Sequence, residues 1–374
     1  MNDNPVKDAA ERRPNAPRLS GQVRIVGAGL LGASIGLALT AQGVDVILAD
    51  ASPAQLRLAV DYGAGRPERA DDAPRIVVVS VPPDVTASVL EAELTRFPDA
   101  VITDVASVKR EPFRTLTQRG VDLTRYIGSH PLAGRERGGA ISARADLFLG
   151  RPWVICRDEE TPSEALALIE DLALDLGASP IEMTPEEHDR SVGLVSHVPQ
   201  LIASLLAKQL VSAPDSAVRL TGQGLRDTTR IAASAPELWV QILGANAGPV
   251  VEVLDGIAAD LAKVTDALRD PEAPGARRAI ADAIAAGNTG VARLPGKHGQ
   301  DRRYATIVVM VDDKPGQLGL LLTELGDIGV NMEDLRLEHS PGAQIGLAEI
   351  AVLPEVQQRT IEDLEARGWR IASV

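Results

Sequence analysis

Apolar residues in the first half of the chain alternate between short runs and stretches with helical spacing. The short runs 23–26, 44–50, 75–80 and 100–104 are rich in Val and Ile, whereas segment 33–43 has the apolar spacing of a helix. Strands that alternate with helical stretches are typical of a parallel, doubly wound sheet. The pattern therefore predicts an α/β domain over residues 21–184.

The pattern changes after residue 184. Residues 185–290 show helical spacing with little strand character, which predicts an all-helical second domain. A stretch rich in Gly and basic residues follows at 291–303 and is interpreted as a linker. Residues 304–374 then predict strand, helix, two strands, helix and strand, a βαββαβ order. Residues 1–20 are polar without periodicity, which predicts a disordered tail.

Composition argues against several classes of partner. The chain has 52 acidic residues against 38 Lys and Arg, a net charge of −14, which would repel the phosphates of a nucleic acid. We find no apolar leader and no run of roughly 18 uninterrupted apolar residues, so we expect a cytoplasmic protein without a membrane partner. The single cysteine, Cys156, lies in an apolar run and predicts a buried side chain. No metal site is expected.

The most specific motif is GAGLLG at residues 27–32, which follows a predicted strand and opens a predicted helix. Asp50, at the end of the next strand, completes the context of a dinucleotide-binding turn. Glycines let the backbone approach a pyrophosphate at the helix N-terminus. Because Asp50 can accept the ribose hydroxyls of NAD and would repel the 2′-phosphate of NADP, NAD is the expected cofactor. We expect a Rossmann-type domain that binds it through Gly27, Gly29, Leu30, Leu31, Gly32 and Asp50.

Two polar segments are expected at the C-terminal edge of this sheet, where open α/β folds bind ligands. They are residues 103–109, which include Ser107, and residues 128–134, which include His130. A histidine there can exchange a proton near neutral pH, as oxidation of an alcohol requires. On these residues alone, a histidine that only caps a loop is an equal alternative.

Several ordered motifs resemble those of the prephenate dehydrogenase family. The segment SHPLAGRERGGAISARADLFLGRPWVI at 129–155 is similar to the family's His-Pro-Met-Ala-Gly pattern, with Leu132 in place of the methionine. His188-Asp189 leading to Ser196-His197-Val198-Pro199, and RDTTRIA at 226–232 followed by Pro236 and Trp239, agree with the same family. The resemblance covers roughly residues 22–300. It implies NAD-dependent oxidative decarboxylation of prephenate to 4-hydroxyphenylpyruvate and CO2 in tyrosine biosynthesis.

The resemblance also implies roles for individual residues. His130 would accept the proton of the ring hydroxyl, and Ser107 would orient His130 and the substrate. Arg230 would pair with a substrate carboxylate, as the planar fork of arginine allows. His197 would line the pocket, and Ser196, Gln200 and Arg226 complete the expected substrate site. For the two arginines, the alternative is a solvated helix face.

Position 200 departs from the family, because many members have histidine where this chain has Gln200. By its spacing Gln200 shares a helix face with Ser196 and His197. The preferred side chain on the substrate ring is therefore open. An arogenate dehydrogenase that yields tyrosine directly remains an alternative. A catalytically silent amino-acid sensor is a third, although the intact set of Ser107, His130 and Arg230 argues against it.

The C-terminal segment resembles an ACT domain. DDKPGQL at 312–318 and GVNM at 329–332 lie within the predicted βαββαβ order. The resemblance implies an amino-acid effector bound between two copies, and the alternative is a domain that only dimerises. The apolar helical region also predicts a homodimer, because such helices often need a partner surface.

Overall fold

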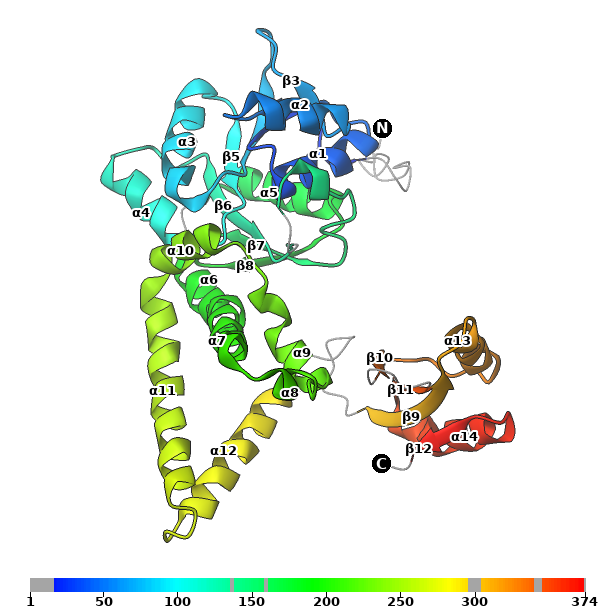
Figure 1. Cartoon of the computed structure of the whole chain (residues 1–374). Coiled ribbons are helices and arrows are strands. Elements are labelled where there is room, and N and C mark those ends of the chain that lie inside the picture. Colours follow the sequence, from blue (N-terminus) through cyan, green and yellow to red (C-terminus); the bar gives the residue numbers. More distant parts are fainter. Residues whose placement is uncertain (1–16, 135–137, 158–160, 295–303, 340–344, 373–374) are drawn as a thin grey trace, which may run out of the picture. The chain divides into compact units, whose positions relative to one another are not determined.

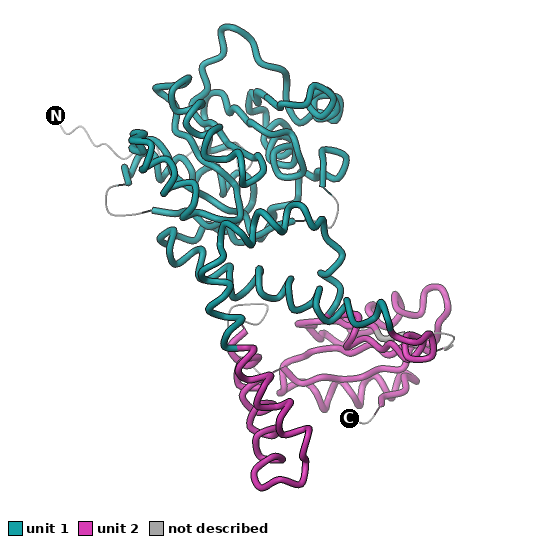
Figure 2. The backbone as a smooth tube through the Cα atoms, turned by 60° about the vertical axis from the view of Figure 1, so that its left-hand side comes forward, with its two compact units in different colours: residues 1–212, 229–256 teal, residues 213–228, 257–374 magenta. Residues whose placement is uncertain are grey.

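The computed structural model describes residues 17–134, 138–157, 161–294, 304–339 and 345–372. The chain divides into two compact units, residues 1–212 with 229–256 and residues 213–228 with 257–374 (Figure 2). Most of the predicted tail at 1–20 and of the predicted linker at 291–303 lies outside the described residues. Each unit is described on its own below.

The first unit contains an eight-stranded sheet (Figure 1). In chain order its strands are β1 (Gln22–Val26), β2 (Val46–Ala49), β3 (Arg66–Pro67), β4 (Pro74–Val79), β5 (Val101–Asp104), β6 (Tyr126–Pro131), β7 (Pro152–Cys156) and β8 (Ser179–Met183). Their spatial order is β3-β2-β1-β4-β5-β6-β7-β8. All neighbours pair in parallel except β6 and β7. The predicted Rossmann-type sheet is thus confirmed.

The antiparallel pair β6–β7 departs from the all-parallel expectation. Parallel neighbours need a crossover connection, usually a helix. Between β6 and β7, the described residues contain only a short 3-10 turn, η1 (Ala140–Ser142). The chain therefore returns beside β6 in the opposite direction, and His130 faces Val154 across the two strands.

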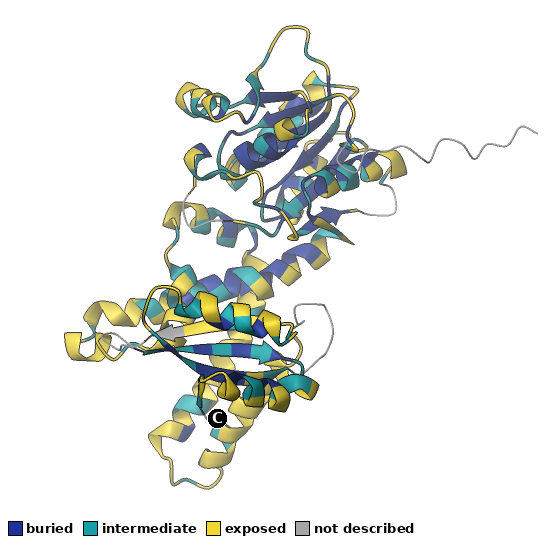
Figure 3. Cartoon of the chain, turned by 90° about the vertical axis from the view of Figure 1, so that its right-hand side faces the viewer, coloured by how far each residue is buried: buried dark blue, intermediate teal, exposed yellow. Residues whose placement is uncertain are grey.

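Helices cover both faces of this sheet. They are α1 (Leu30–Ala41), α2 (Pro53–Asp61), α3 (Pro83–Arg96), α4 (Arg110–Gln118) and α5 (Ser163–Asp175). Strand β4 shows why two layers are needed: Ile76 and Val78 belong to one apolar cluster, and Val77 and Val79 belong to another. Because successive strand residues point to opposite faces, an uninterrupted apolar run predicts burial on both sides. Figure 3 shows these strands as buried.

Helices dominate the chain after β8, as predicted. They are α6 (Pro185–Val192), the π-helical turn η2 (Gly193–His197), α7 (Val198–Lys208), η3 (Gln209–Ser212), α8 (Asp215–Val218), α9 (Gln223–Thr229), η4 (Arg230–Ala232), α10 (Pro236–Ala245), α11 (Ala247–Arg269) and α12 (Ala276–Val291). A capping box starts α6, in which the Thr184 hydroxyl accepts from the Glu187 N–H and the Glu187 carboxylate accepts from the Thr184 N–H.

One continuous helical stretch, Pro185–Ser212, is long and apolar enough to span a membrane by length and composition. The sequence-based expectation of no such span considered only uninterrupted apolar runs. The stretch contains His188, Asp189 and His197, whose side chains are buried against other protein groups. The buried share of its most apolar 18-residue window is 22%, so most of these apolar residues lie at the surface of the described structure.

The described residues from 304 onward form the predicted βαββαβ order. The elements are β9 (Ala305–Asp312), α13 (Gln317–Asp327), β10 (Asp334–His339), β11 (Ile345–Val352), α14 (Pro354–Ala366) and β12 (Arg370–Ala372). The sheet order is β10-β11-β9-β12, and every neighbouring pair is antiparallel. Alternate β9 residues, Ile307 and Val309, pack with Leu321 of α13 and Leu364 of α14 in one core.

Candidate active site

Close backbone contacts require glycine at two positions of the turn after β1. Gly27 has φ +101°, and a Cβ there would lie 2.2 Å from the Ser80 carbonyl oxygen. A Cβ on Gly32 would lie 1.9 Å from the Gly27 carbonyl oxygen. Both positions therefore require glycine for packing of the turn, the strand and α1.

Gly29 differs, because a Cβ there would meet nothing within 4 Å. Gly29 is also the N-cap of α1 and supplies no capping side chain, and the first turn, which begins with Leu30 and Leu31, holds no acidic residue. The first N–H groups of a helix have no partner within the helix and attract anions. The open space at Gly29 thus fits the pyrophosphate of a dinucleotide.

Asp50 closes the other side of the turn. Its carboxylate accepts hydrogen bonds from the Ala28 N–H and the Ser52 N–H, both at 2.7 Å. The side chain is half-buried just after β2, next to the turn. This position suits a carboxylate that receives ribose hydroxyls, so the residues present fit NAD.

The two kinds of glycine give opposite predictions. Gly29→Val should fold normally but weaken NAD binding at least ~10-fold, because its side chain fills open space beside the helix N-terminus. Gly32→Ala should lower the melting temperature, because its Cβ would collide with backbone. Calorimetric titration with NAD and thermal unfolding of both variants test this, and an unchanged NAD affinity in Gly29→Val would contradict it.

His130 lies at the end of β6 and contacts a second histidine. Its Nδ1 is 2.9 Å from Nε2 of His188, and Nδ1 of His188 is 2.7 Å from Oδ1 of Asp189. His130 is partly exposed, whereas His188 and Asp189 are fully buried at 0%. The structure thus joins two motifs that lie 58 residues apart.

His130, His188 and Asp189 form a hydrogen-bonded row, and backbone and side-chain groups hold its buried end, Asp189. The Asp189 carboxylate accepts the N–H groups of Lys109 and Arg110, at 2.8 and 3.0 Å, where α4 begins. The Lys109 ammonium donates to Asp104, whose other oxygen accepts the Tyr126 hydroxyl at 2.7 Å. The Lys109 and Asp104 side chains are 1% and 0% exposed. The Lys109 ammonium thus compensates Asp104, whereas the Asp189 carboxylate is held by the backbone N–H groups of Lys109 and Arg110 and by His188.

His197 belongs to the same polar core. Asn246 Nδ2 donates to the Asp189 carbonyl oxygen at 2.7 Å and lies 3.0 Å from His197 Nδ1. A carbonyl oxygen needs a donor, so the Asn246 amide nitrogen must face it. In neutral His197, Nδ1 then accepts and Nε2 carries the proton. His197 also meets Trp239 edge to face, with ring centroids 6.1 Å apart.

Burial keeps these histidines neutral. It lowers the pKa of His130 well below 6.5, and His188, Lys109 and His197 act in the same direction. Burial also lowers the pKa of His188, although its hydrogen bond to Asp189 opposes this. The pKa of His197 falls to about 4, mainly through burial. At neutral pH the ring of His130 is therefore a free base.

The other predicted residues lie in different surroundings. Ser107 is half-buried in the turn between β5 and α4, and within the described residues it makes no hydrogen bond to His130. Ser196 is half-buried in the π-helical turn η2. Gln200 is buried on α7, and its amide nitrogen donates to the Ser234 hydroxyl at 2.6 Å.

The two predicted arginines fall in different units. Arg230 is exposed at the start of η4, which packs against α7. Arg226 is exposed on α9 and belongs to the second unit. The structure thus gathers His130, His197 and Gln200 within the first unit, and Arg230 lies in that unit on a segment that touches α7.

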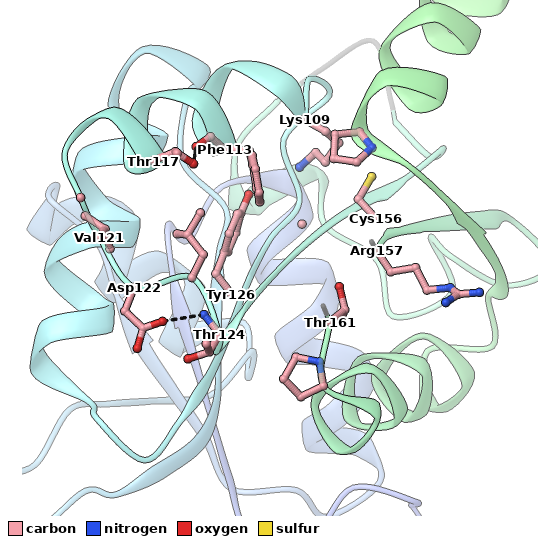
Figure 4. A pocket seen from close by; sticks show the side chains of 15 residues that line it. Lys109, Phe113, Thr117, Val121, Asp122, Thr124, Tyr126, Cys156, Arg157 and Thr161 are labelled. Atoms are coloured by element: carbon pink, nitrogen blue, oxygen red, sulfur yellow. Dashed lines mark hydrogen bonds between the residues drawn. The ribbon is translucent and has the colours of Figure 1, made fainter. Parts of the chain in front are cut away.

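A pocket of about 470 Å³ lies beside this core (Figure 4). Lys109, Tyr126, Cys156 and Arg157 are among the residues that line it. Neither His130 nor the glycine turn lines it, so the substrate is not expected there. Cys156 is buried as predicted, and desolvation raises its pKa to about 12, which makes the thiol unreactive. Among the described residues, no group of three or more His, Cys, Asp or Glu side chains could hold a metal ion.

Two family models match the chain. One, described as the nucleotide-binding domain of prephenate dehydrogenase, matches residues 35–182. The other, described as its dimerization domain, matches residues 184–281. Neither match reaches the C-terminal sheet.

Known relatives agree with these matches. A probable prephenate dehydrogenase, NovF of Streptomyces niveus, is 35% identical over 353 residues, which cover 92% of this chain and 98% of the relative. A cyclohexadienyl dehydrogenase of Zymomonas mobilis is 32% identical over 260 residues, which cover 66% of this chain and 88% of the relative.

A solved structure of prephenate dehydrogenase from Aquifex aeolicus, in complex with hydroxyphenyl propionate and NAD+, is also similar. It has a TM-score of 0.63 and 26% identity, and the match covers 73% of this chain and 99% of that one. Arogenate dehydrogenase from Synechocystis has a TM-score of 0.58 at 26% identity, covering 72% of this chain and 99% of that one.

Proposed function

The chain belongs to the prephenate dehydrogenase family, and we propose that it catalyses the NAD-dependent oxidative decarboxylation of prephenate to 4-hydroxyphenylpyruvate and CO2. The observation that carries this proposal is the place of His130. His130 lies near the end of β6 and the glycine turn follows β1, so both lie at the C-terminal edge of the parallel strands β1, β4, β5 and β6. A ligand that binds along this edge can touch both.

NAD, when bound, supplies the acceptor for the hydride that leaves the ring carbon bearing the hydroxyl group. His130 takes the hydroxyl proton on Nε2, and the carbon becomes a ketone. The bond to the ring carboxylate then breaks, and its electron pair makes the ring aromatic as CO2 leaves. His130 returns the proton to the ring oxygen, which becomes a phenol. Atoms and charge balance, and His130 ends as a neutral base.

The substrate carries two carboxylates, and separate groups are proposed for them. The Arg230 guanidinium suits the planar carboxylate of the ring or the side chain. His197 presents an Nε2–H donor, because Asn246 occupies its Nδ1. Ser107, Ser196 and Gln200 complete the proposed substrate site, and Ser107 is proposed to orient His130. The role of Arg226, which lies in the second unit, stays a prediction from the family resemblance.

The test is a direct assay of the purified full chain. NAD is mixed with prephenate or with arogenate, and the absorbance of NADH is followed. We expect turnover with prephenate and NAD, and a much lower kcat/KM with NADP. Turnover of arogenate alone would favour the arogenate alternative, which the uncharged Gln200 permits because it does not repel an ammonium. No NADH with either substrate would overturn the proposal.

We propose that the active form is a homodimer built through the helical region. That region exposes large apolar side chains, among them Val211 at 87%, Leu220 at 85% and Val240 at 70%. Exposed apolar patches mark interaction surfaces. The matched dimerization-domain model over residues 184–281 supports pairing through the same region of the chain. Light scattering should give twice the chain mass of 39.4 kDa.

We also propose that residues 304–374 form an ACT domain that binds an amino acid. The βαββαβ order and the antiparallel β10-β11-β9-β12 sheet support this proposal. Gly316, with φ +88°, turns the chain from β9 into α13 and leaves the helix N-terminus without a capping side chain.

Tyrosine at millimolar concentration is therefore expected to inhibit the intact enzyme. A chain that ends at Gln300 should keep its kcat and lose this inhibition. Rates of both chains are measured at several tyrosine concentrations, with alanine as the control amino acid. An intact enzyme that ignores tyrosine and the other aromatic amino acids would exclude this regulation.

A further inference from the structure

His188 and Asp189 form a row of hydrogen-bonded groups behind His130 that the proposed roles do not use. Both are fully buried and consecutive on α6, and only His130 of the three is partly exposed. The distances are 2.9 Å from His130 to His188 and 2.7 Å from His188 to Asp189. The row therefore begins at the substrate side and ends inside the protein.

Hydrogen bonding fixes the position of every proton in this row. Burial acts to raise the pKa of Asp189, but hydrogen bonds from His188 and from the Lys109 and Arg110 N–H groups hold it below its ordinary value. Asp189 is thus a carboxylate, which can only accept, so Nδ1 of His188 carries a proton. Nε2 of the neutral His188 then accepts from Nδ1 of His130. The lone pair of His130 is left on Nε2, the atom that faces away from His188.

From this row we infer that His188 and Asp189 are positioning residues, which hold His130 in the tautomer with a free Nε2 and stabilise its protonated form. The inference rests on the proposed function, since it needs His130 to take up a proton. A carboxylate that orients a histidine base and compensates its positive charge is an established device in enzymes.

The charges around the row support the second part of the inference. Asp104, Lys109 and Asp189 are buried, and together they carry one net negative charge while the histidines are neutral. His197 is also near the row and is neutral. The proton taken from the substrate brings the buried cluster to zero net charge. The fixed negative charge thus stabilises the protonated His130 ring in place of the water that would otherwise solvate it.

The test is a pair of variants in the full chain, Asp189→Asn and His188→Gln, assayed with prephenate and NAD. The asparagine side chain has almost the shape of aspartate but no charge, and it can hold His188 in the wrong tautomer. We expect kcat to fall about 10- to 100-fold in each variant, with KM changed less than about 3-fold. NAD affinity and the melting temperature are measured to show that each variant is folded.

The pH profile separates positioning from a merely structural role. Loss of the Asp189 charge makes protonation of the His130–His188 pair less favourable. The acid limb of kcat in Asp189→Asn should therefore move to lower pH while the plateau falls. Glu187→Gln is the matched control on the same helix, because Glu187 is exposed and glutamine preserves its capping role. The control should keep both the rate and the pH profile of the wild type.

Three results would overturn the inference. They are full kcat in both variants, an acid limb that does not move, and a rise in KM without a fall in kcat. These outcomes are distinct from failure of the proposed function, in which the wild-type chain itself produces no NADH from prephenate.

Discussion

His130→Asn is expected to lower kcat for prephenate by roughly 10²- to 10⁴-fold, with KM changed little. The asparagine amide can still contact His188, but it cannot take a proton from the ring hydroxyl. Hydride then has to leave an alcohol that keeps its proton, which is far less favourable. Steady-state rates of NADH formation at saturating NAD measure the effect directly.

His197→Asn is the matched control. His197 is a buried histidine beside the same polar core, but its Nδ1 is engaged by Asn246 and its Nε2 carries a proton. It can donate to the substrate and cannot act as a base, so its loss should raise KM more than it lowers kcat. A His130→Asn enzyme with wild-type turnover would remove His130 from the chemistry.

The low basicity of His130 also predicts how kcat changes with pH. Because its pKa lies well below 6.5, the neutral ring persists as the pH falls through that ordinary value. Wild-type kcat should therefore stay level from about pH 8 down to about pH 6 and decline only at lower pH. Circular dichroism over the same range would show that loss of rate is not loss of fold.

The fold was predictable wherever a local pattern decides it. The glycine turn, the strands rich in Val and Ile, and the βαββαβ order at the C-terminus follow from spacing over fewer than about 15 residues. The direction of β7 was not predictable in this way. It depends on what the chain does between β6 and β7, where no periodic signal distinguishes a crossover from a return.

The site was predictable only in part, for a related physical reason. The histidine at the sheet edge could be found, because the ends of parallel strands meet at one edge. Its partner could not be derived from spacing, since His188 lies 58 residues farther on. The motif His188-Asp189 carried the family resemblance without showing which group each residue contacts. No sequence motif pointed to Asn246, which lies 49 residues after His197 and contacts it only in the folded chain.

Lys109→Met is expected to reduce the free energy of unfolding of the first unit by about 3–5 kcal/mol. Lys109 and Asp104 are 1% and 0% exposed and form an ion pair. Methionine fills most of the same volume, but among the described residues the Asp104 carboxylate then keeps only the Tyr126 hydroxyl and the Ala106 N–H as donors. An unpaired Asp104 charge in the interior should cost far more free energy than methionine preserves by filling the same volume. Urea unfolding followed by far-UV circular dichroism measures the loss.

Two further variants show whether this loss comes from the buried charge. Arg110→Met is the adjacent control, since its ion pair with Glu186 spans 3.7 Å between side chains that are 53% and 65% exposed, and such pairs contribute at most about 1 kcal/mol. Adding Asp104→Asn to Lys109→Met removes the charge while an oxygen remains for the Tyr126 hydroxyl. The double variant should therefore be more stable than Lys109→Met alone. A double variant that is less stable than the single one would mean that Lys109 acts through packing, because the buried charge would then have cost nothing.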